Sequence, residues 1–446
     1  MSEHSIGIAA PQDPGLLYAT ATAAWNQDFD ALTPLATIAI GFGTTIDAET
    51  FRRDAQNLCL VIDRSGSMAE TIDARTQTSK LTAVRVGLDR LIARLTPDDL
   101  ISVVTFNAAS RIEVEAVAGD DVAGIKRAYD AVEAEGATNI ARAMRLAYQT
   151  VARNRDPARN DRIMVFTDGL PTAGARESDD FLPVMRQYAA ENIGATIIGV
   201  GGNYGDQLVY DVSQVRGGNA FYMGDYDQIV HVFDDEFEYM VTPVAYNVVL
   251  SSSVPFAFDV HDVYGIPEPE SLSHTLELNV PTLFLSSREG GGIVLVRLRA
   301  GALVNFDEPN TLANIDLSYE TPDGQRVSTT LDVNLPAGQD PGATESYFES
   351  DGTRRAVLLA DTARVLRNAC ADIYPSYDYY YGYYPSRSDG NDTAINRLTE
   401  FLPYFDALAA GLEDQPSPTS RSLSEERSLV ERLLSNIQAI QASFSR

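Results

Sequence analysis

The sequence predicts an α/β fold in which a doubly wound, mainly parallel sheet is inserted in, or followed by, an antiparallel β-sandwich. A helical region is expected at the C-terminal end. Three observations predict this arrangement. Apolar runs alternate with amphipathic stretches over 57–241, short alternating runs separated by turn residues fill 242–340, and helical periodicity returns over 341–446. Residues 1–56 form a separate N-terminal segment that contributes one further predicted strand.

The region 57–241 shows the strand–helix alternation that is typical of a parallel sheet with helices on both faces. The run LCLVID at 58–63 is continuously apolar, as expected of a strand that is buried on both sides. Further strands are predicted at 100–106, 111–118 (an edge strand), 162–169, 194–202 and 220–222. Helices are predicted at 81–95 after an N-cap at Ser79, and at 121–134, 139–153, 178–190, 205–215 and 225–240.

After Pro243 the pattern of apolar and polar residues changes to short alternating runs, such as HTLELNV and IVLVRLRA, which are separated by Pro, Gly, Asp and Asn. This pattern predicts a small antiparallel sandwich. The earlier run ATIAIGF at 36–42 also reads as a strand. If it pairs with the sandwich, the α/β region is an insertion between two parts of that sandwich.

The C-terminal region contains two apolar stripes at helical spacing. The final one, built from Val430, Leu433, Ile437, Ile440 and Phe444, is compatible with a coiled-coil seam, but a helix that packs on its own domain is favoured because the repeat is short. Between the stripes, seven of the eleven residues at 374–384 are tyrosine. This segment is either a recognition loop or, as we favour, a low-complexity insertion.

Composition excludes several classes of protein. Lys and Arg number 34 against 63 Asp and Glu, a net charge of −29, and Lys80 and Lys126 are the only lysines. Nucleic-acid binding requires a basic face, so no nucleic-acid partner is expected. No apolar run approaches the ~18 residues of a membrane span, and no signal peptide is visible, so we expect a cytoplasmic protein without a membrane span.

Three short motifs place oxygen-bearing side chains at strand ends of the predicted sheet. D-R-S-G-S-M places Asp63 at the end of a strand and Ser65 and Ser67 in the loop after it. G-A-T-N-I places Thr138 before a helix, and F-T-D-G places Asp168 at the end of another buried strand. Ligands of doubly wound sheets bind beyond the carboxyl ends of the strands, and these groups are the hard oxygen ligands that Mg²⁺ prefers.

In these motifs the sequence resembles the von Willebrand factor type A (VWA) domain, whose metal-ion-dependent adhesion site is matched without a gap. The resemblance covers roughly 57–241. It implies that Ser65, Ser67 and Thr138 coordinate a divalent cation, while Asp63 and Asp168 hold it largely through waters and hydrogen bonds. The implied cation is Mg²⁺, with Mn²⁺ or Ca²⁺ as alternatives. The flanks resemble, more weakly, bacterial relatives of calcium-activated chloride-channel accessory subunits and of inter-alpha-trypsin inhibitor heavy chains.

A cation with few anionic ligands keeps much of its charge and can accept an Asp or Glu carboxylate from a protein partner. From their positions next to the predicted ligands, we expect four residues to form the rim that contacts this partner: Met68, Asn139, Gly169 and Leu170. The preferred function is therefore a non-enzymatic, Mg²⁺-dependent protein-interaction module, an adaptor or assembly component.

Catalytic functions find little support in the sequence. None of the four histidines lies in the three motifs, and neither a metalloprotease motif nor a phosphate-binding G-x-x-x-x-G-K-[ST] loop occurs. Two alternatives stay open. The chain could couple a separate MoxR- or chelatase-type AAA⁺ ATPase to a client, or it could be an exported adhesin.

Overall fold

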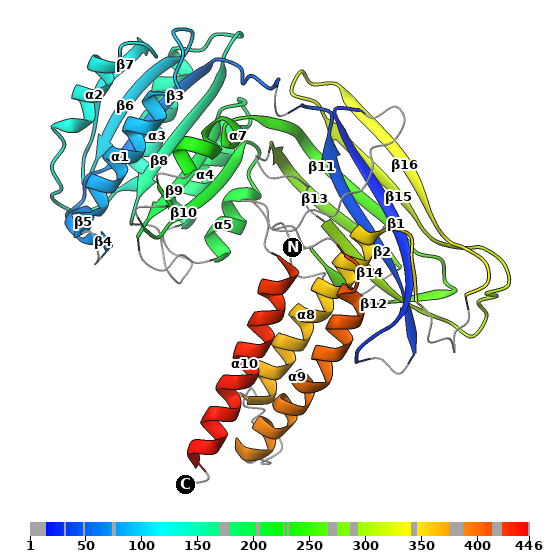
Figure 1. The fold of residues 1–446 in the computed structure, drawn as a ribbon. Coiled ribbons are helices and arrows are strands. Elements are labelled where there is room, and N and C mark those ends of the chain that lie inside the picture. Colours follow the sequence, from blue (N-terminus) through cyan, green and yellow to red (C-terminus); the bar gives the residue numbers. More distant parts are fainter. Residues whose placement is uncertain are drawn as a thin grey trace.

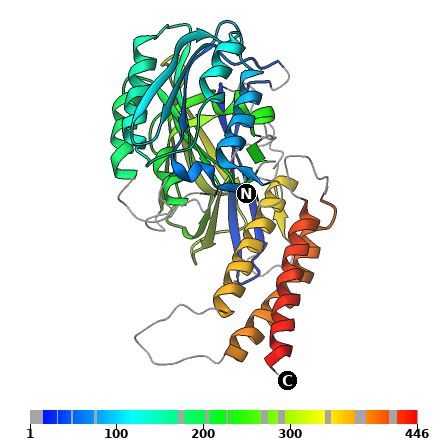
Figure 2. The same cartoon turned by 90° about the vertical axis from the view of Figure 1, so that its left-hand side faces the viewer.

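The computed structural model describes most of the chain in three parts: an α/β domain, a β-sandwich and a bundle of three long helices (Figure 1). The described residues are 15–30, 33–47, 50–73, 77–169, 178–201, 206–225, 228–229, 232–265, 274–285, 293–339, 346–373, 387–412 and 422–444. The tyrosine-rich segment 374–384 lies outside them. In Figures 1 and 2 the three long C-terminal helices project downward beneath the α/β domain and the sandwich.

The α/β domain is built on a six-stranded sheet of order β10-β9-β8-β3-β6-β7, in which only β7 runs antiparallel to its neighbour. Its strands are β3 (Gln56–Asp63), β6 (Leu100–Phe106), β7 (Ser110–Ala118), β8 (Asn160–Thr167), β9 (Gly194–Val200) and β10 (Gly218–Met223). Every residue of β3 is buried, because helices cover both faces of this central strand. The predicted doubly wound sheet is confirmed.

The helices divide between the two faces of the sheet, each with its own apolar core. One face is covered by α1 (Lys80–Ile92), α2 (Val122–Asp130), the π-helical turn η2 (Val232–Glu236) and α7 (Phe237–Met240). The other face is covered by α3 (Ile140–Arg153), α4 (Ser178–Ala189) and α5 (Asp206–Ser213). Ser79 caps α1 as predicted, since its Oγ accepts a hydrogen bond from the Thr82 N–H at 3.2 Å.

The sandwich packs a five-stranded sheet of order β12-β14-β2-β1-β17 against a four-stranded sheet of order β13-β11-β15-β16. The strands of the first sheet are β1 (Leu17–Gln27), β2 (Pro34–Thr44), β12 (Phe258–Tyr264), β14 (Ile293–Ala300) and β17 (Tyr347–Phe348). Those of the second are β11 (Pro243–Ser253), β13 (Thr275–Phe284), β15 (Asn310–Glu320) and β16 (Arg326–Leu335). Because β2, which contains the run 36–42, pairs with β14, the α/β domain is an insertion within the sandwich.

The α/β domain rests on the sandwich through the segment that leads into β10. The Gly217 N–H donates to Thr282 Oγ1 at 2.7 Å, and the Arg216 guanidinium pairs with Glu320 at 2.7 Å. The same guanidinium lies 3.8 Å from the centroid of the Tyr246 ring. These three contacts hold the inserted domain against the sandwich. The chain also connects the two parts twice, between β2 and β3 and between α7 and β11.

The C-terminal helices α8 (Asp351–Ile373), α9 (Arg387–Ala409) and α10 (Leu423–Phe444) share one apolar core. In α10, Val430 and Ile437 are buried in this core, whereas Ile440 is 47% exposed. The apolar stripe of α10 therefore packs on its own bundle, as favoured from the sequence. Among the described residues, none of the helices combines the length and apolar character that crossing a bilayer requires.

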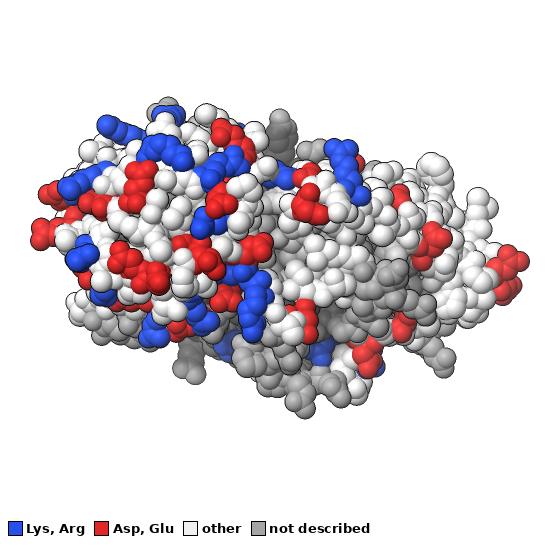
Figure 3. Space-filling model, turned by 90° about the horizontal axis from the view of Figure 1, so that it is seen from above, with Lys and Arg blue, Asp and Glu red and all other residues white. Residues whose placement is uncertain are grey.

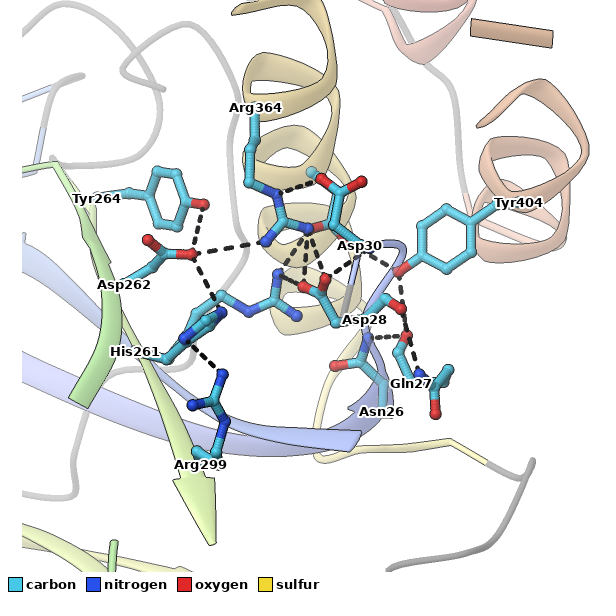
Figure 4. A network of polar contacts seen from close by, with 12 residues as sticks. Asn26, Gln27, Asp28, Asp30, His261, Asp262, Tyr264, Arg299, Arg364 and Tyr404 are labelled. Atoms are coloured by element: carbon cyan, nitrogen blue, oxygen red, sulfur yellow. Dashed lines mark hydrogen bonds and ion pairs between the residues drawn. The ribbon is translucent and has the colours of Figure 1, made fainter. Parts of the chain in front are cut away.

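A buried polar network attaches the bundle to the sandwich (Figure 4). Arg297 of β14 contacts both Asp28, which follows β1, and Asp361 of α8, each at 2.5 Å. Arg364, one turn further along α8, also pairs with Asp28 at 2.8 Å. The Tyr404 hydroxyl of α9 donates to Asp361 at 2.7 Å. Arg364 also lies 3.4 Å from Asp30 and 3.5 Å from Asp262, so these buried groups are the centre of a larger network of ion pairs.

Two predicted helices differ from the observed ones. The helix predicted at 121–134 ends at Asp130, and the residues after it form an irregular loop. In the segment predicted as the helix 225–240, the structure includes the π-helical turn η2 before the short helix α7. Phe233 and Phe237 of this segment are buried in the core of the α/β domain.

Candidate metal centre

The predicted ligands come together at the edge where the parallel strands end, beside the small two-stranded sheet of β4 (Thr71–Asp73) and β5 (Thr78–Ser79) and the start of α1 (Figure 1). Asp63 is the last residue of β3, and Asp168 directly follows the neighbouring β8. β3 and β8 pair in parallel, so both carboxylates lie at the same edge of the sheet.

A chain of hydrogen bonds joins four predicted ligands. Asp63 Oδ1 accepts the Ser65 N–H at 2.7 Å, the hydroxyls of Ser65 and Ser67 are 3.1 Å apart, and Ser67 Oγ donates to Asp168 Oδ1 at 2.8 Å. Thr167 Oγ1 donates to Asp63 Oδ2 at 2.5 Å and accepts the Gly169 N–H at 3.0 Å. Asp63 and Ser65 are buried and the Asp168 side chain is 3% exposed, so the cluster is largely shielded from solvent.

The fifth predicted ligand, Thr138, reaches the cluster from the loop between α2 and α3. This loop is tied to the D-R-S-G-S-M loop, since the Gly66 N–H donates to Gly136 O at 2.9 Å and the Glu135 N–H donates to Arg64 O at 2.7 Å. Thr138 then lies against Gly169: a Cβ built on that glycine would be 2.9 Å from Thr138 Cγ2 and 3.4 Å from its Oγ1. All five predicted ligands therefore come from three loops at one edge.

Sequence reasoning missed two side chains of this cluster. Thr167 precedes Asp168 in the F-T-D-G motif but has no role in the metal-site prediction, although its hydroxyl holds Asp63. Lys80, the first residue of α1, places its ammonium 2.7 Å from Asp168 Oδ2 and 2.8 Å from Glu70 Oε2. The scarcity of lysine in the sequence was a signal for Lys80, but nothing local connected it with the site.

Burial and hydrogen bonds act in opposite directions on the pKa values of Asp63 and Lys80. Burial raises the pKa of Asp63 above its usual value, while hydrogen bonds from Thr167 and Ser65 act in the opposite direction. Burial alone would lower the pKa of Lys80, but hydrogen bonds to Asp168 and Glu70 raise it overall. Lys80 is therefore charged at neutral pH and partly balances the carboxylates.

The side chains present fit a hard divalent cation. The cluster offers three hydroxyls and two carboxylates, which are oxygen ligands of the type that Mg²⁺ takes, and it already attracts a positive group in the Lys80 ammonium.

The rim selected from the sequence requires one correction. Met68 is fully buried in the core under α1, because the 3-10 turn η1 (Gly66–Ala69) directs its side chain inward, so Met68 does not form part of a contact surface. Asn139 is exposed and caps α3, with its Oδ1 accepting the Arg142 N–H at 3.1 Å. Gly169 is partly exposed beside Thr138, and Leu170 lies outside the described residues.

A family model of the von Willebrand factor type A domain matches residues 58–170. The matched range runs from β3 to the residues after β8 and includes the five predicted ligands. Together with the doubly wound sheet, this match shows that the chain contains a VWA domain.

Two relatives align beyond the matched range. The uncharacterized protein YfbK of Escherichia coli (strain K12) is 27% identical over 247 residues, which cover 55% of this chain and 40% of that protein. The chain therefore matches less than half the length of YfbK. The uncharacterized protein sll0103 of Synechocystis sp. (strain ATCC 27184 / PCC 6803 / Kazusa) is 26% identical over 330 residues, 73% of this chain and 72% of that protein. Among solved structures, a von Willebrand factor type A protein from Catenulispora acidiphila has a TM-score of 0.48 at 14% identity, covering 93% of this chain and 95% of its own.

Proposed function

We propose that the chain is a non-enzymatic protein-interaction module, an adaptor or assembly component, that docks an acidic side chain of a partner on a divalent cation. The observation that carries this proposal is the hydrogen-bonded chain that joins Asp63, Ser65, Ser67 and Asp168 at the carboxyl edge of the sheet. VWA domains mediate protein–protein interactions, which is the broader role that the family match supports.

The proposed cation is Mg²⁺, held by the hydroxyls of Ser65, Ser67 and Thr138, with Asp63 and Asp168 orienting the site through hydrogen bonds. When bound, the cation supplies a positive charge that is only partly neutralised and a position that an incoming carboxylate can take from water. The protein keeps the hydroxyls in place, since Asp63 holds the Ser65 backbone and Asp168 holds the Ser67 hydroxyl.

The charge of the protein bears on the choice of partner. Figure 3 shows one face of the molecule, on which Lys and Arg alternate with Asp and Glu over the α/β domain and form no continuous basic field. The chain as a whole carries a net charge of −29. Because the chain as a whole is acidic, an acidic partner needs a local attraction in order to bind, and a divalent cation would provide it.

The proposal of binding without catalysis follows from the groups that surround the site. His261 and His274, the two histidines among the described residues, lie in the sandwich, in β12 and just before β13. The described side chains around Asp63 and Asp168 are hydroxyls, carboxylates and one lysine that is already paired. They suit docking better than proton transfer.

The test uses a displayed peptide library selected on the whole chain in Mg²⁺, with each selected peptide remade so that Asp and Glu become Asn and Gln. We expect binding to be lost in EDTA, with the amide peptides, and with the Asp63→Asn/Asp168→Asn variant. A matched control is Asp98→Asn/Asp120→Asn, which removes the same charge from exposed positions at the opposite edge of the sheet. Peptides that bind equally in Mg²⁺ and EDTA would contradict the proposal.

A further inference from the structure

Lys80 joins the proposed metal centre to a glutamate outside it. Its Nζ lies 2.7 Å from Asp168 Oδ2 and 2.8 Å from Glu70 Oε2. The lysine side chain is only 12% exposed, whereas the Glu70 side chain is 68% exposed. The ammonium thus bridges a buried carboxylate of the site and a carboxylate at the surface.

The fold builds this position from three elements. β4 and β5 form a hairpin, in which Thr71 pairs with Ser79, so that Glu70 and Lys80 face each other at its base. The Lys80 N–H donates to Glu70 O at 2.9 Å. The lysine stem then passes Gly201, which follows β9 with a φ of +73°, and a Cβ on this residue would be 2.9 Å from Lys80 Cε. A glycine at 201 leaves the path of the lysine open.

Lys80 completes a set of contacts that satisfies both carboxylates from within the chain. Asp168 accepts from Ser67 at Oδ1 and from Lys80 at Oδ2. Asp63 accepts from the Ser65 N–H at Oδ1 and from Thr167 at Oδ2. Each carboxylate oxygen of Asp63 and Asp168 thus accepts a hydrogen bond from within the chain, and the Lys80 ammonium is the positive charge that contacts Asp168.

A divalent cation held by Ser67 would lie beside this ammonium, since both groups are bonded to the same carboxylate. Like charges repel strongly over such a short separation in a buried site. We propose that Lys80 is a built-in competitor of the divalent cation, which releases Asp168 and remains on Glu70 when the cation binds. This inference rests on the proposed function, and it makes cation binding a switch between two charge arrangements.

The first experiment measures Mn²⁺ and Mg²⁺ affinity by calorimetry for wild type, Lys80→Met and Lys126→Met. Removing one positive charge beside a divalent cation should tighten binding about tenfold for Lys80→Met. Lys126→Met is the matched control. Lys126 of α2 is the only other lysine of the sequence and pairs with Asp89 of α1, so its replacement should leave the cation affinity unchanged. Equal or weaker binding by Lys80→Met would overturn the inference.

The second experiment needs no variant. Amine acylation followed by peptide mass spectrometry reports the two lysines separately in the wild-type chain. We expect Mg²⁺ to raise the acylation rate of Lys80 several-fold while that of Lys126 stays constant. A Lys80 rate that does not rise in saturating Mg²⁺ would overturn the inference. If calorimetry shows no cation binding in any of the three proteins, the metal site itself is wrong, and the role of Lys80 is lost with it.

Discussion

Gly169 lies directly against Thr138, the predicted ligand that the loop between α2 and α3 contributes. A Cβ on Gly169 would be 2.9 Å from Thr138 Cγ2, which is closer than side chains tolerate. The side chain of Thr138 would have to shift or rotate. Gly66 offers the comparison, because a Cβ there would meet its nearest neighbour, Gly136 O, at an ordinary 3.5 Å.

We therefore expect Gly169→Ala to weaken Mn²⁺ binding about tenfold, because a displaced ligand loses its alignment with the others. Gly66→Ala should bind as wild type does. Calorimetric titration of both variants, with circular dichroism to establish that each is folded, makes the comparison. Wild-type affinity in Gly169→Ala would show that Thr138 does not take part in holding the cation.

Individual residues of the site differ in how far the sequence predicts them. Asp63, Ser65 and Ser67 belong to one short motif, so their proximity follows from chain connectivity alone. Met68 belongs to the same motif, but whether a side chain points outward or into the core depends on the turn that η1 adopts. Thr167 and Lys80 contact partners that are 104 and 88 positions away in the sequence, and no local pattern indicates such pairs.

At the scale of elements, the start of the α/β domain is held by a buried ion pair. Arg53, in the segment that enters the domain, pairs with Asp99 at 2.6 Å, and their side chains are 5% and 0% exposed. Asp99 also accepts the N–H groups of Thr96 and of Gln56, the first residue of β3. Burial alone would raise the pKa of Asp99, but these hydrogen bonds and the charge of Arg53 hold it below its usual value.

The lowered pKa predicts how stability depends on pH. The unfolded chain binds a proton at Asp99 more readily than the folded chain, so the ion pair stabilises the fold above about pH 4, and this contribution is lost as the pH falls further. We expect Asp99→Asn to lower the free energy of unfolding by about 3 kcal/mol at pH 7, because the buried Arg53 guanidinium is left without a counter-charge. The difference from wild type should narrow below about pH 4.

Urea unfolding at a series of pH values measures this effect. The neighbouring Asp98→Asn is the control, since Asp98 is exposed and its replacement should change stability little. A destabilisation by Asp99→Asn that is the same at pH 3 and pH 7 would contradict the assignment to the ion pair.

Periodicity predicts most of the elements, and the early end of one predicted helix has a tertiary cause. The helix predicted at 121–134 stops at Asp130 because the residues after it make hydrogen bonds to other loops. Glu135, for example, donates its N–H to Arg64 O and accepts from Asn107 Nδ2. Gly136, with a φ of +82°, allows the chain to turn there. Contacts with the D-R-S-G-S-M loop therefore decide where the helix ends.

At the scale of the whole molecule, Arg297 joins the sandwich to the helical bundle. Its guanidinium is fully buried between Asp28 and Asp361. Removing one partner from a buried ion network leaves uncompensated charge, which typically destabilises a protein by several kcal/mol. We expect Arg297→Met to lower the free energy of unfolding by at least about 3 kcal/mol and to make the segment α8–α10 more sensitive to protease.

The matched control is Arg299→Met, two residues along the same strand, where the side chain is exposed and contacts His261. Urea unfolding and limited proteolysis of both variants give the readout. Equal stability of Arg297→Met and Arg299→Met would show that the junction does not depend on the buried network.

The sequence by itself determined the parallel sheet, the helices on its two faces, the alternating strands of the sandwich and the cluster of oxygen-bearing residues. Each of these features is predicted by local periodicity or by a short motif at a strand end. Only the tertiary structure decided that β2 pairs with β14, that Met68 is buried, and that Lys80 reaches Asp168. These features depend on contacts between segments that are distant in the sequence. Such contacts contribute to stability only once the folded chain has brought the segments together.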